Sequence, residues 1–108
     1  FILPKQLPQS KTGWLAYPIT ITEKAPFSRT EMQIFLEKRN IQTRVVFTGN
    51  ILRQPGFKNI KAKKDKNGYP EADKVMKNGI LIACHHGLTK RMISHIHNSI
   101  DEFMVKYT

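Results

Sequence analysis

The spacing of hydrophobic and polar positions changes along the chain, and each change marks a predicted element. Residues 14–22 are rich in aromatic and β-branched side chains, which predicts a strand. Pro18 lies within this strand and has no amide hydrogen to donate, which indicates a sheet edge or a bulge. From residue 28 to about residue 39 or 40, apolar positions follow the helical period. We expect the buried side of this helix to hold Met32, Ile34, Phe35 and Leu36.

Local signals mark both ends of that helix. Ser28 at the N-cap and Glu31 three residues later form a capping box, in which each side chain bonds to the other residue's amide. Phe27 and Met32 are placed to form the accompanying hydrophobic staple. Asn40 is expected to end the helix, because Asn tolerates the left-handed backbone of a C-terminal cap.

Three further elements follow. The β-branched run of residues 41–47 predicts a second strand, and residues 48–69 carry no period and predict an irregular segment. Pro70 suits the first turn of a short helix that closes at Asn78. The continuous apolar run of residues 80–84 predicts a central strand buried on both faces.

The last element is a longer helix, which completes the predicted fold. Thr89 is its expected N-cap, with Leu88 and Ile93 as the staple. Its apolar face should hold Met92, Ile93, Ile96, Ile100, Phe103, Met104 and Tyr107. The order of elements predicts an α/β (α+β) two-layer sandwich, in which helices cover one face of a sheet of three or four strands. Residues 1–108 are expected to form a single domain.

Composition favours an anionic partner. Of the 108 residues, 40% are hydrophobic and 24% charged, and the formal net charge is +10. Such a field attracts nucleic acid, nucleotides or acidic protein faces. No apolar run reaches the ~20 residues of a membrane helix. The single cysteine, Cys84, cannot form an internal disulfide, which favours a reducing compartment such as the cytoplasm.

The first residues suggest a fragment. Phe1-Ile2-Leu3-Pro4 has no Met and no charged segment followed by a long apolar one, so it is not a signal peptide. The sequence begins as though in mid-course, and we expect it to be part of a longer protein.

The histidines and the cysteine are spaced poorly for a metal site. Cys84, His85 and His86 are consecutive, and His95 and His97 point to different sides of a predicted helix, so these ligands do not converge as zinc requires. Cys84 ends an apolar strand, where cysteine is usually inert core. His85 or His86, just before a helix N-terminus, could instead contact a ligand phosphate. We expect no metal site and no catalytic residue here.

Two stretches carry much of the positive charge. Residues 58–66 hold five lysines in nine positions, which usually indicates a solvated loop. Residues 43–55 end a β-branched run in a Gly-Asn loop and carry Arg44 and Arg53, whose forked guanidinium groups suit phosphate or carboxylate. The same pattern also fits a solvated strand end with two surface arginines.

A small basic nucleic-acid-binding module is the alternative from another functional class. The charge supports it, but no RNP-type aromatic motif, KH-type GxxG loop or recognition helix is present, and nucleic acid is not the partner that we expect. The chain also has no GxGxxG, P-loop or HExxH motif and no paired carboxylates, so it offers almost nothing as a free-standing catalyst.

The segment of residues 43–55 resembles the TR-x-x-F-x-GN-x-x-RQP segment of the DegT/DnrJ/StrS family of sugar aminotransferases, which depend on pyridoxal phosphate (PLP). The most similar branch is that of the NDP-hexulose 3-dehydrases of lipopolysaccharide biosynthesis and their aminotransferase relatives. Further segments agree in order with this family, namely residues 1–4 with Trp14, residues 25–29 (PFSR), residues 72–76 (AD-x-(I/V)-M) and residues 84–89 (CHHG-(L/M)-(T/S)).

The resemblance implies a C-terminal small domain of a longer fold-type I enzyme. In such enzymes an α/β sandwich covers the cofactor cleft of a homodimer. The large domain supplies the phosphate cup, the Asp partner of the pyridinium nitrogen and the lysine that binds PLP, which is a histidine in the dehydrase branch. The expected cofactor is PLP or pyridoxamine phosphate (PMP), bound mainly outside these residues, so the chain alone should be inactive. The choice between aminotransferase and dehydrase stays open.

The resemblance also implies substrate-binding residues but no catalytic residue in this chain. The loop expected to face the cleft, together with two secondary histidine candidates, gives Arg44, Gly49, Asn50, Arg53, Gln54, His85 and His86. Arg44 and Arg53 would contact the anionic part of a nucleotide-diphosphate sugar or help to close the site.

Overall fold

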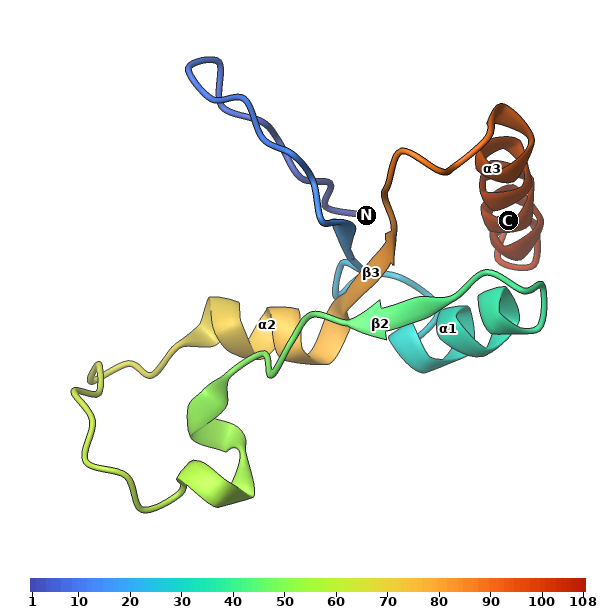
Figure 1. Cartoon of the computed structure of the whole chain (residues 1–108). Coiled ribbons are helices and arrows are strands. Elements are labelled where there is room, and N and C mark those ends of the chain that lie inside the picture. Colours follow the sequence, from blue (N-terminus) through green and yellow to red (C-terminus); the bar gives the residue numbers. More distant parts are fainter.

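The computed structural model describes all 108 residues and shows a small antiparallel sheet with three α-helices (Figure 1). The strands are β1 (Ala16–Thr20), β2 (Thr43–Val45) and β3 (Gly79–Ala83). The helices are α1 (Arg29–Glu37), α2 (Pro70–Asn78) and α3 (Lys90–Val105), and two 3-10 turns, Ile51–Arg53 and Pro55–Phe57, lie between β2 and α2. The predicted α/β class with a three-stranded sheet is confirmed. None of the helices is long and apolar enough to cross a bilayer.

β3 is the central strand and pairs antiparallel with both neighbours, in the order β1-β3-β2. Pro18 therefore lies in an edge strand, opposite Leu81, as predicted. β2 is shorter than the expected residues 41–47. At one end, the Ile41 amide donates to the Leu36 carbonyl at the end of α1 and is therefore not available for pairing in the sheet. At the other end the backbone turns left-handed at Phe47, with φ of 46°.

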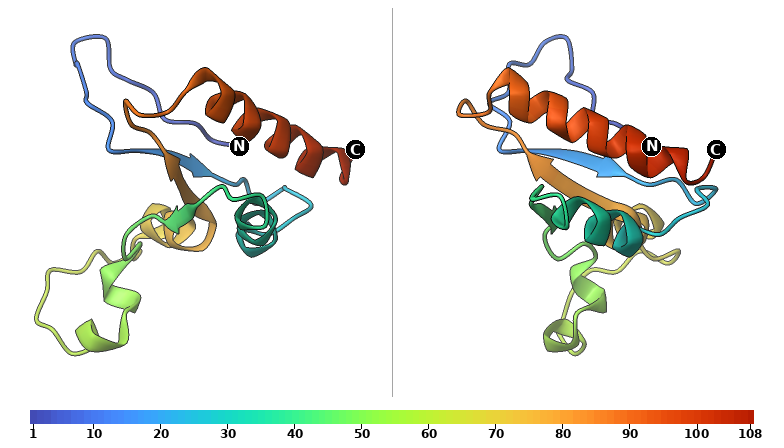
Figure 2. Two further views of the ribbon diagram at one scale, coloured as in Figure 1. Left: turned by 45° about the vertical axis from the view of Figure 1, so that its right-hand side comes forward. Right: turned by 90° about the vertical axis from the view of Figure 1, so that its right-hand side faces the viewer.

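Only one face of the sheet is buried. Ile19, Ile80 and Ile82 point to the same side and belong to the hydrophobic core. On the opposite side of β3, Leu81 is half-buried and Ala83 is exposed. The prediction that this strand is buried on both faces is therefore wrong, because the core that α1 and α3 complete lies on a single face; these two helices lie side by side in both views (Figure 2).

The capping box and the left-handed Asn40 are confirmed, the helix ends slightly earlier than predicted, and one predicted core residue is wrong. The Ser28 hydroxyl accepts from the Glu31 amide, and the Glu31 carboxylate accepts from the Ser28 amide. The helix ends at Glu37, and Asn40 follows with φ of 60°. Ile34 is 51% exposed, because positions 32, 35 and 36 share one helix face and position 34 lies across from it.

α3 packs on the core from Ile96 onwards. Phe103 is buried, and Ile96, Ile100, Met104 and Tyr107 pack against the core. Met92 and Ile93 were also expected on this face, but they are exposed because the first turn of α3 extends beyond the packed core. The His95 Nε2 atom lies 2.9 Å from the Arg39 carbonyl, and Glu102 pairs with Arg39, so α3 is also attached to the end of α1.

α2 continues directly into β3. The helix ends at Asn78 and the strand begins at Gly79, where an added Cβ would lie 2.6 Å from the Val75 carbonyl oxygen. Arg29 at the start of α1 donates to the Met76 carbonyl at 2.6 Å. This bond satisfies a carbonyl at the end of α2 and places a cation where the helix dipole favours one.

The Phe103 ring should be the most costly core side chain to remove. It contacts the rings of Phe27, Phe35 and Tyr107 at centroid distances of 4.9, 5.1 and 5.2 Å. We expect Phe103→Ala to lower the free energy of unfolding by about 3–5 kcal/mol, measured by urea unfolding. The exposed Val105 on the same helix is the control, and its replacement by Ala should change stability by less than about 0.5 kcal/mol. Equal effects at the two positions would contradict this core.

Candidate functional site

The predicted site residues fall into two groups: Arg44 with the loop that follows β2, and the two histidines that follow β3. Arg44 and Val45 pair with Leu81 and Ile80, so β2 enters its loop beside the start of β3. His85 and His86 follow the other end of β3. A five-residue strand separates the loop from the histidines by roughly 16 Å. The structure therefore brings the loop residues together and places the two histidines apart from them.

The loop after β2 needs glycine at position 49. The Gly49 backbone has φ of 62°, and its amide donates to the Val46 carbonyl. An added Cβ would lie 2.3 Å from the Met76 Cβ atom, so the loop backbone presses directly on α2. A few residues later the Gln54 side-chain Nε2 atom donates to the Thr48 carbonyl at 2.9 Å, which closes the loop on itself. Gly49 and Gln54 thus shape this loop.

Asn50 and Arg53 are bound to one carboxylate on α2. The Asn50 Nδ2 atom donates to Asp73 Oδ1 at 2.8 Å. The Arg53 Nε and Nη2 atoms donate to the two Asp73 oxygens at 3.1 and 2.8 Å. Asn50 is buried, and its own oxygen accepts from the Leu52 amide, so it caps the first 3-10 turn. We call Asn50, Arg53 and Asp73 the Asp73 clamp.

The clamp changes the acidity of both charged partners. Hydrogen bonds from Arg53, and after them the bond from Asn50, lower the pKa of Asp73 below its ordinary value. The hydrogen bond to Asp73 likewise raises the pKa of Arg53. The positive charge of Arg53 is therefore paired with a carboxylate of α2.

Arg44 is in a different situation. Its side chain is exposed, it forms none of the ion pairs, and its Nη1 atom donates only to the Thr43 carbonyl at 3.0 Å. The neighbouring Glu37 carboxylate accepts from the Thr43 amide and hydroxyl, bonds that lower the pKa of Glu37. Arg44 thus carries a guanidinium without a bonded carboxylate partner.

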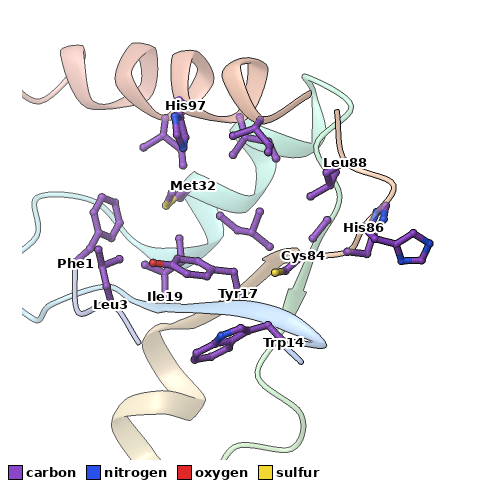
Figure 3. Close-up of a pocket in the computed structure, with 16 residues that line it drawn as sticks. Phe1, Leu3, Trp14, Tyr17, Ile19, Met32, Cys84, His86, Leu88 and His97 are labelled. Atoms are coloured by element: carbon purple, nitrogen blue, oxygen red, sulfur yellow. The ribbon is translucent and has the colours of Figure 1, made fainter. Parts of the chain in front are cut away.

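His85 and His86 border an apolar cavity of about 730 Å³ (Figure 3). It lies on the core face, between the first half of α3, β1 and the N-terminal segment. His97 of α3 and Tyr17 of β1 lie on facing walls (Figure 3). The Nδ1 atom of His85 accepts from the Gly87 amide at 3.1 Å, which orients its ring. No three His, Cys, Asp or Glu side chains converge as metal ligands.

The whole chain was then compared with known proteins. Residues 2–101 match the DegT/DnrJ/EryC1/StrS aminotransferase family. The chain belongs to this family. The resemblance predicted from its sequence segments is therefore confirmed.

Two relatives are similar to the chain over nearly its whole length. The chain is 35% identical over 105 residues to dTDP-4-dehydro-2,6-dideoxy-D-glucose 3-dehydratase of Saccharopolyspora spinosa. The aligned region covers 97% of this chain and 22% of the relative. It is 32% identical over 101 residues to lipopolysaccharide biosynthesis protein RfbH of Salmonella typhimurium, covering 94% of this chain and 23% of the relative. The chain thus spans about a quarter of the length of these relatives.

Solved structures of the family share the fold. A DegT/DnrJ/EryC1/StrS aminotransferase from Brucella abortus matches with a TM-score of 0.77 and 16% identity over 94% of this chain and 25% of that one. The E. coli GDP-4-keto-6-deoxy-D-mannose-3-dehydratase with bound hydrated PLP matches with a TM-score of 0.71 and 18% identity over 91% of this chain and 25% of that one. The expected resemblance to part of a PLP-dependent enzyme is confirmed at the level of the fold.

Two features of this loop were missed in the sequence. Asp73 lies in a family-like segment, but nothing in the sequence shows that its carboxylate meets residues 20 or more positions earlier. Phe47 has a left-handed backbone, and its ring is 75% exposed. A bulky residue in that region is strained, and no local signal predicts it at Phe.

Gly49 should tolerate no side chain. We expect Gly49→Ala to lower the free energy of unfolding by about 1–3 kcal/mol, because the left-handed backbone and the contact with Met76 both oppose a Cβ atom. Gly56→Ala is the matched control, since open space surrounds Gly56. Urea unfolding of the two variants measures the difference, and a neutral Gly49→Ala would show that the loop does not press on α2.

The Asp73 clamp should stabilise the chain at neutral pH and fail in acid. Folding lowers the pKa of Asp73, so its stabilisation is fully present above the unfolded value of about 4 and is lost as pH falls through the lower folded pKa. We expect Asp73→Asn to lower the melting temperature at pH 7, with a difference from wild type that shrinks below about pH 4.

Asp101→Asn is the control for this pH series. Asp101 is exposed and forms no ion pair, so removing its charge should leave the pH profile of thermal unfolding unchanged. A difference between Asp73→Asn and wild type that is constant from pH 7 to pH 2.5 would contradict the clamp.

Proposed function

We propose that residues 1–108 form the C-terminal small domain of a PLP- or PMP-dependent enzyme that acts on a nucleotide-diphosphate sugar. The activity is that of a 3-dehydrase or an aminotransferase in the synthesis of cell-surface polysaccharide such as lipopolysaccharide. The observation that carries this proposal is the 35% identity, across 97% of the chain, to a dTDP-hexose 3-dehydratase. The similarity to a lipopolysaccharide biosynthesis protein supports the proposed role in polysaccharide synthesis.

The residues of this chain do not form a cofactor site by themselves. A lysine that binds PLP is desolvated in a pocket, whereas no lysine here is buried, and the half-buried Lys74 is paired with Glu71. The large domain of the proposed enzyme therefore supplies the cofactor and the reacting groups. This domain supplies residues that line the substrate side of the cleft.

The residues that the sequence places near the substrate form two groups on this domain. Arg44 lies opposite the middle of β3, and the loop of Gly49, Asn50, Arg53 and Gln54 follows β2 beyond the start of β3. His85 and His86 lie at the other end and would meet a different part of the ligand or of the enzyme. We further propose that the enzyme is a cytoplasmic homodimer and that nucleic acid is not its partner.

The test is an activity assay on the full-length enzyme that contains residues 1–108. After reconstitution with PLP or PMP, it is given dTDP- and GDP-linked 4-keto-6-deoxy sugars, and the sugar products are analysed by mass spectrometry. Loss of the C3 hydroxyl identifies a dehydrase, and gain of an amino group identifies an aminotransferase. Absence of both products with all these sugars would contradict the proposal.

The 108-residue chain alone should not bind the cofactor in a defined way. We expect titration with PLP to give only weak, unsaturated absorbance changes, because the exposed lysines react without a shaped site. A stoichiometric absorbance band that one Lys→Arg change abolishes would show that the chain holds its own cofactor site. Free N-acetyl-lysine at matched amine concentration provides the background.

A further inference from the structure

We infer that the two arginines of the loop have separate tasks: Asp73 makes Arg53 a positioning residue, and Arg44 is left as the group that contacts the anionic part of the substrate. This inference rests on the proposed function for the identity of the ligand. It is otherwise carried by the contacts of the two guanidinium groups.

The Arg53 guanidinium is already bonded to a carboxylate of α2. Its Nε and Nη2 atoms form a fork with both Asp73 oxygens, the geometry in which an arginine–carboxylate pair is strongest. Although 65% of the Arg53 side chain is exposed, an anion that approaches it also meets the Asp73 carboxylate. The pair therefore offers little net attraction to a phosphate.

Asp73 fixes both ends of one 3-10 turn. Asn50 is the N-cap of the turn Ile51–Arg53, and Arg53 is its last residue. Because both donate to the same carboxylate, the turn cannot move away from α2 without breaking three hydrogen bonds. The Gly49 contact with Met76 holds the preceding residues against the same helix. The segment is thus pre-organised, as a binding loop needs to be.

Arg44 has the properties that Arg53 lacks. It lies in β2, in register with Leu81 of the central strand, so its backbone is held by the sheet. It shares the sheet face with Pro18 and Leu81, opposite the face that carries the core. The nearby Glu37 carboxylate accepts its hydrogen bonds from Thr43 and none from Arg44, so it attracts the guanidinium through space without occupying its donors. The Arg44 guanidinium is permanently charged, is carried by a strand of the sheet and has no carboxylate bonded to it. These properties suit the binding of a diphosphate.

The first experiment measures the binding of dTDP and GDP to the full-length enzyme by calorimetry. Arg44→Gln should weaken the affinity for the preferred nucleotide by about 10- to 100-fold, as expected for loss of a charged hydrogen bond, and leave the melting temperature nearly unchanged. Arg53→Gln should lower the melting temperature and change the affinity by less than about threefold. Loss of affinity in Arg53→Gln equal to that in Arg44→Gln, or unchanged affinity in Arg44→Gln, would overturn the inference.

The second experiment tests the positioning role in the 108-residue chain by a double-mutant cycle of Arg53→Gln and Asp73→Asn. The double variant should melt at about the temperature of Asp73→Asn alone, because that change already removes the ion pair with Arg53. The charge-swapped pair Arg53→Asp with Asp73→Arg should recover part of the loss, which a general structural disturbance would not allow. Additive effects without recovery would overturn the role of Arg53.

The two experiments separate the inference from the proposed function. If the wild-type enzyme binds neither nucleotide and converts no nucleotide sugar, the proposed function fails and the role of Arg44 fails with it. The cycle still decides the role of Arg53. If the enzyme is active and only the arginine variants behave otherwise than expected, the inference alone is wrong.

Discussion

The Asp73 carboxylate accepts three hydrogen bonds from Asn50 and Arg53, and through them it holds the long segment between β2 and α2 on the rest of the fold. That segment contains only two short 3-10 turns, and an unattached connection of this length would be expensive to order. Gly49 adds a direct contact with Met76 on the same helix. The conformation of the candidate site thus depends on one helix of nine residues.

Elements whose signals are local could be predicted from the sequence. The Ser28–Glu31 capping box and the Thr89 cap give the starts of two helices, because their hydrogen bonds join residues only three apart. Burial was less predictable because it depends on distant packing. The apolar run of residues 80–84 predicted a strand buried on both faces. The packing of α1 and α3 on one face alone is determined by the assembled fold and has no signal in this run.

The candidate site could likewise be predicted only in part. The family-like segments identified the loop residues, but they could not separate Arg44 from Arg53, because the partner of Arg53 lies 20 positions further on in another segment. Antiparallel pairing with β3 places His85 and His86 at the opposite end of the sheet. Residues that the sequence analysis assigned to one site from two separate segments therefore lie apart because of the strand direction.

The junction of α2 with β3 has a mechanical consequence. No linker separates the helix from the central strand, Gly79 fits only because it lacks a Cβ atom, and Arg29 fastens α1 to the same point. A rotation of α2 is therefore passed on to the sheet without a hinge to absorb it. We therefore expect the loop, α2 and the sheet to move together in any displacement of this domain.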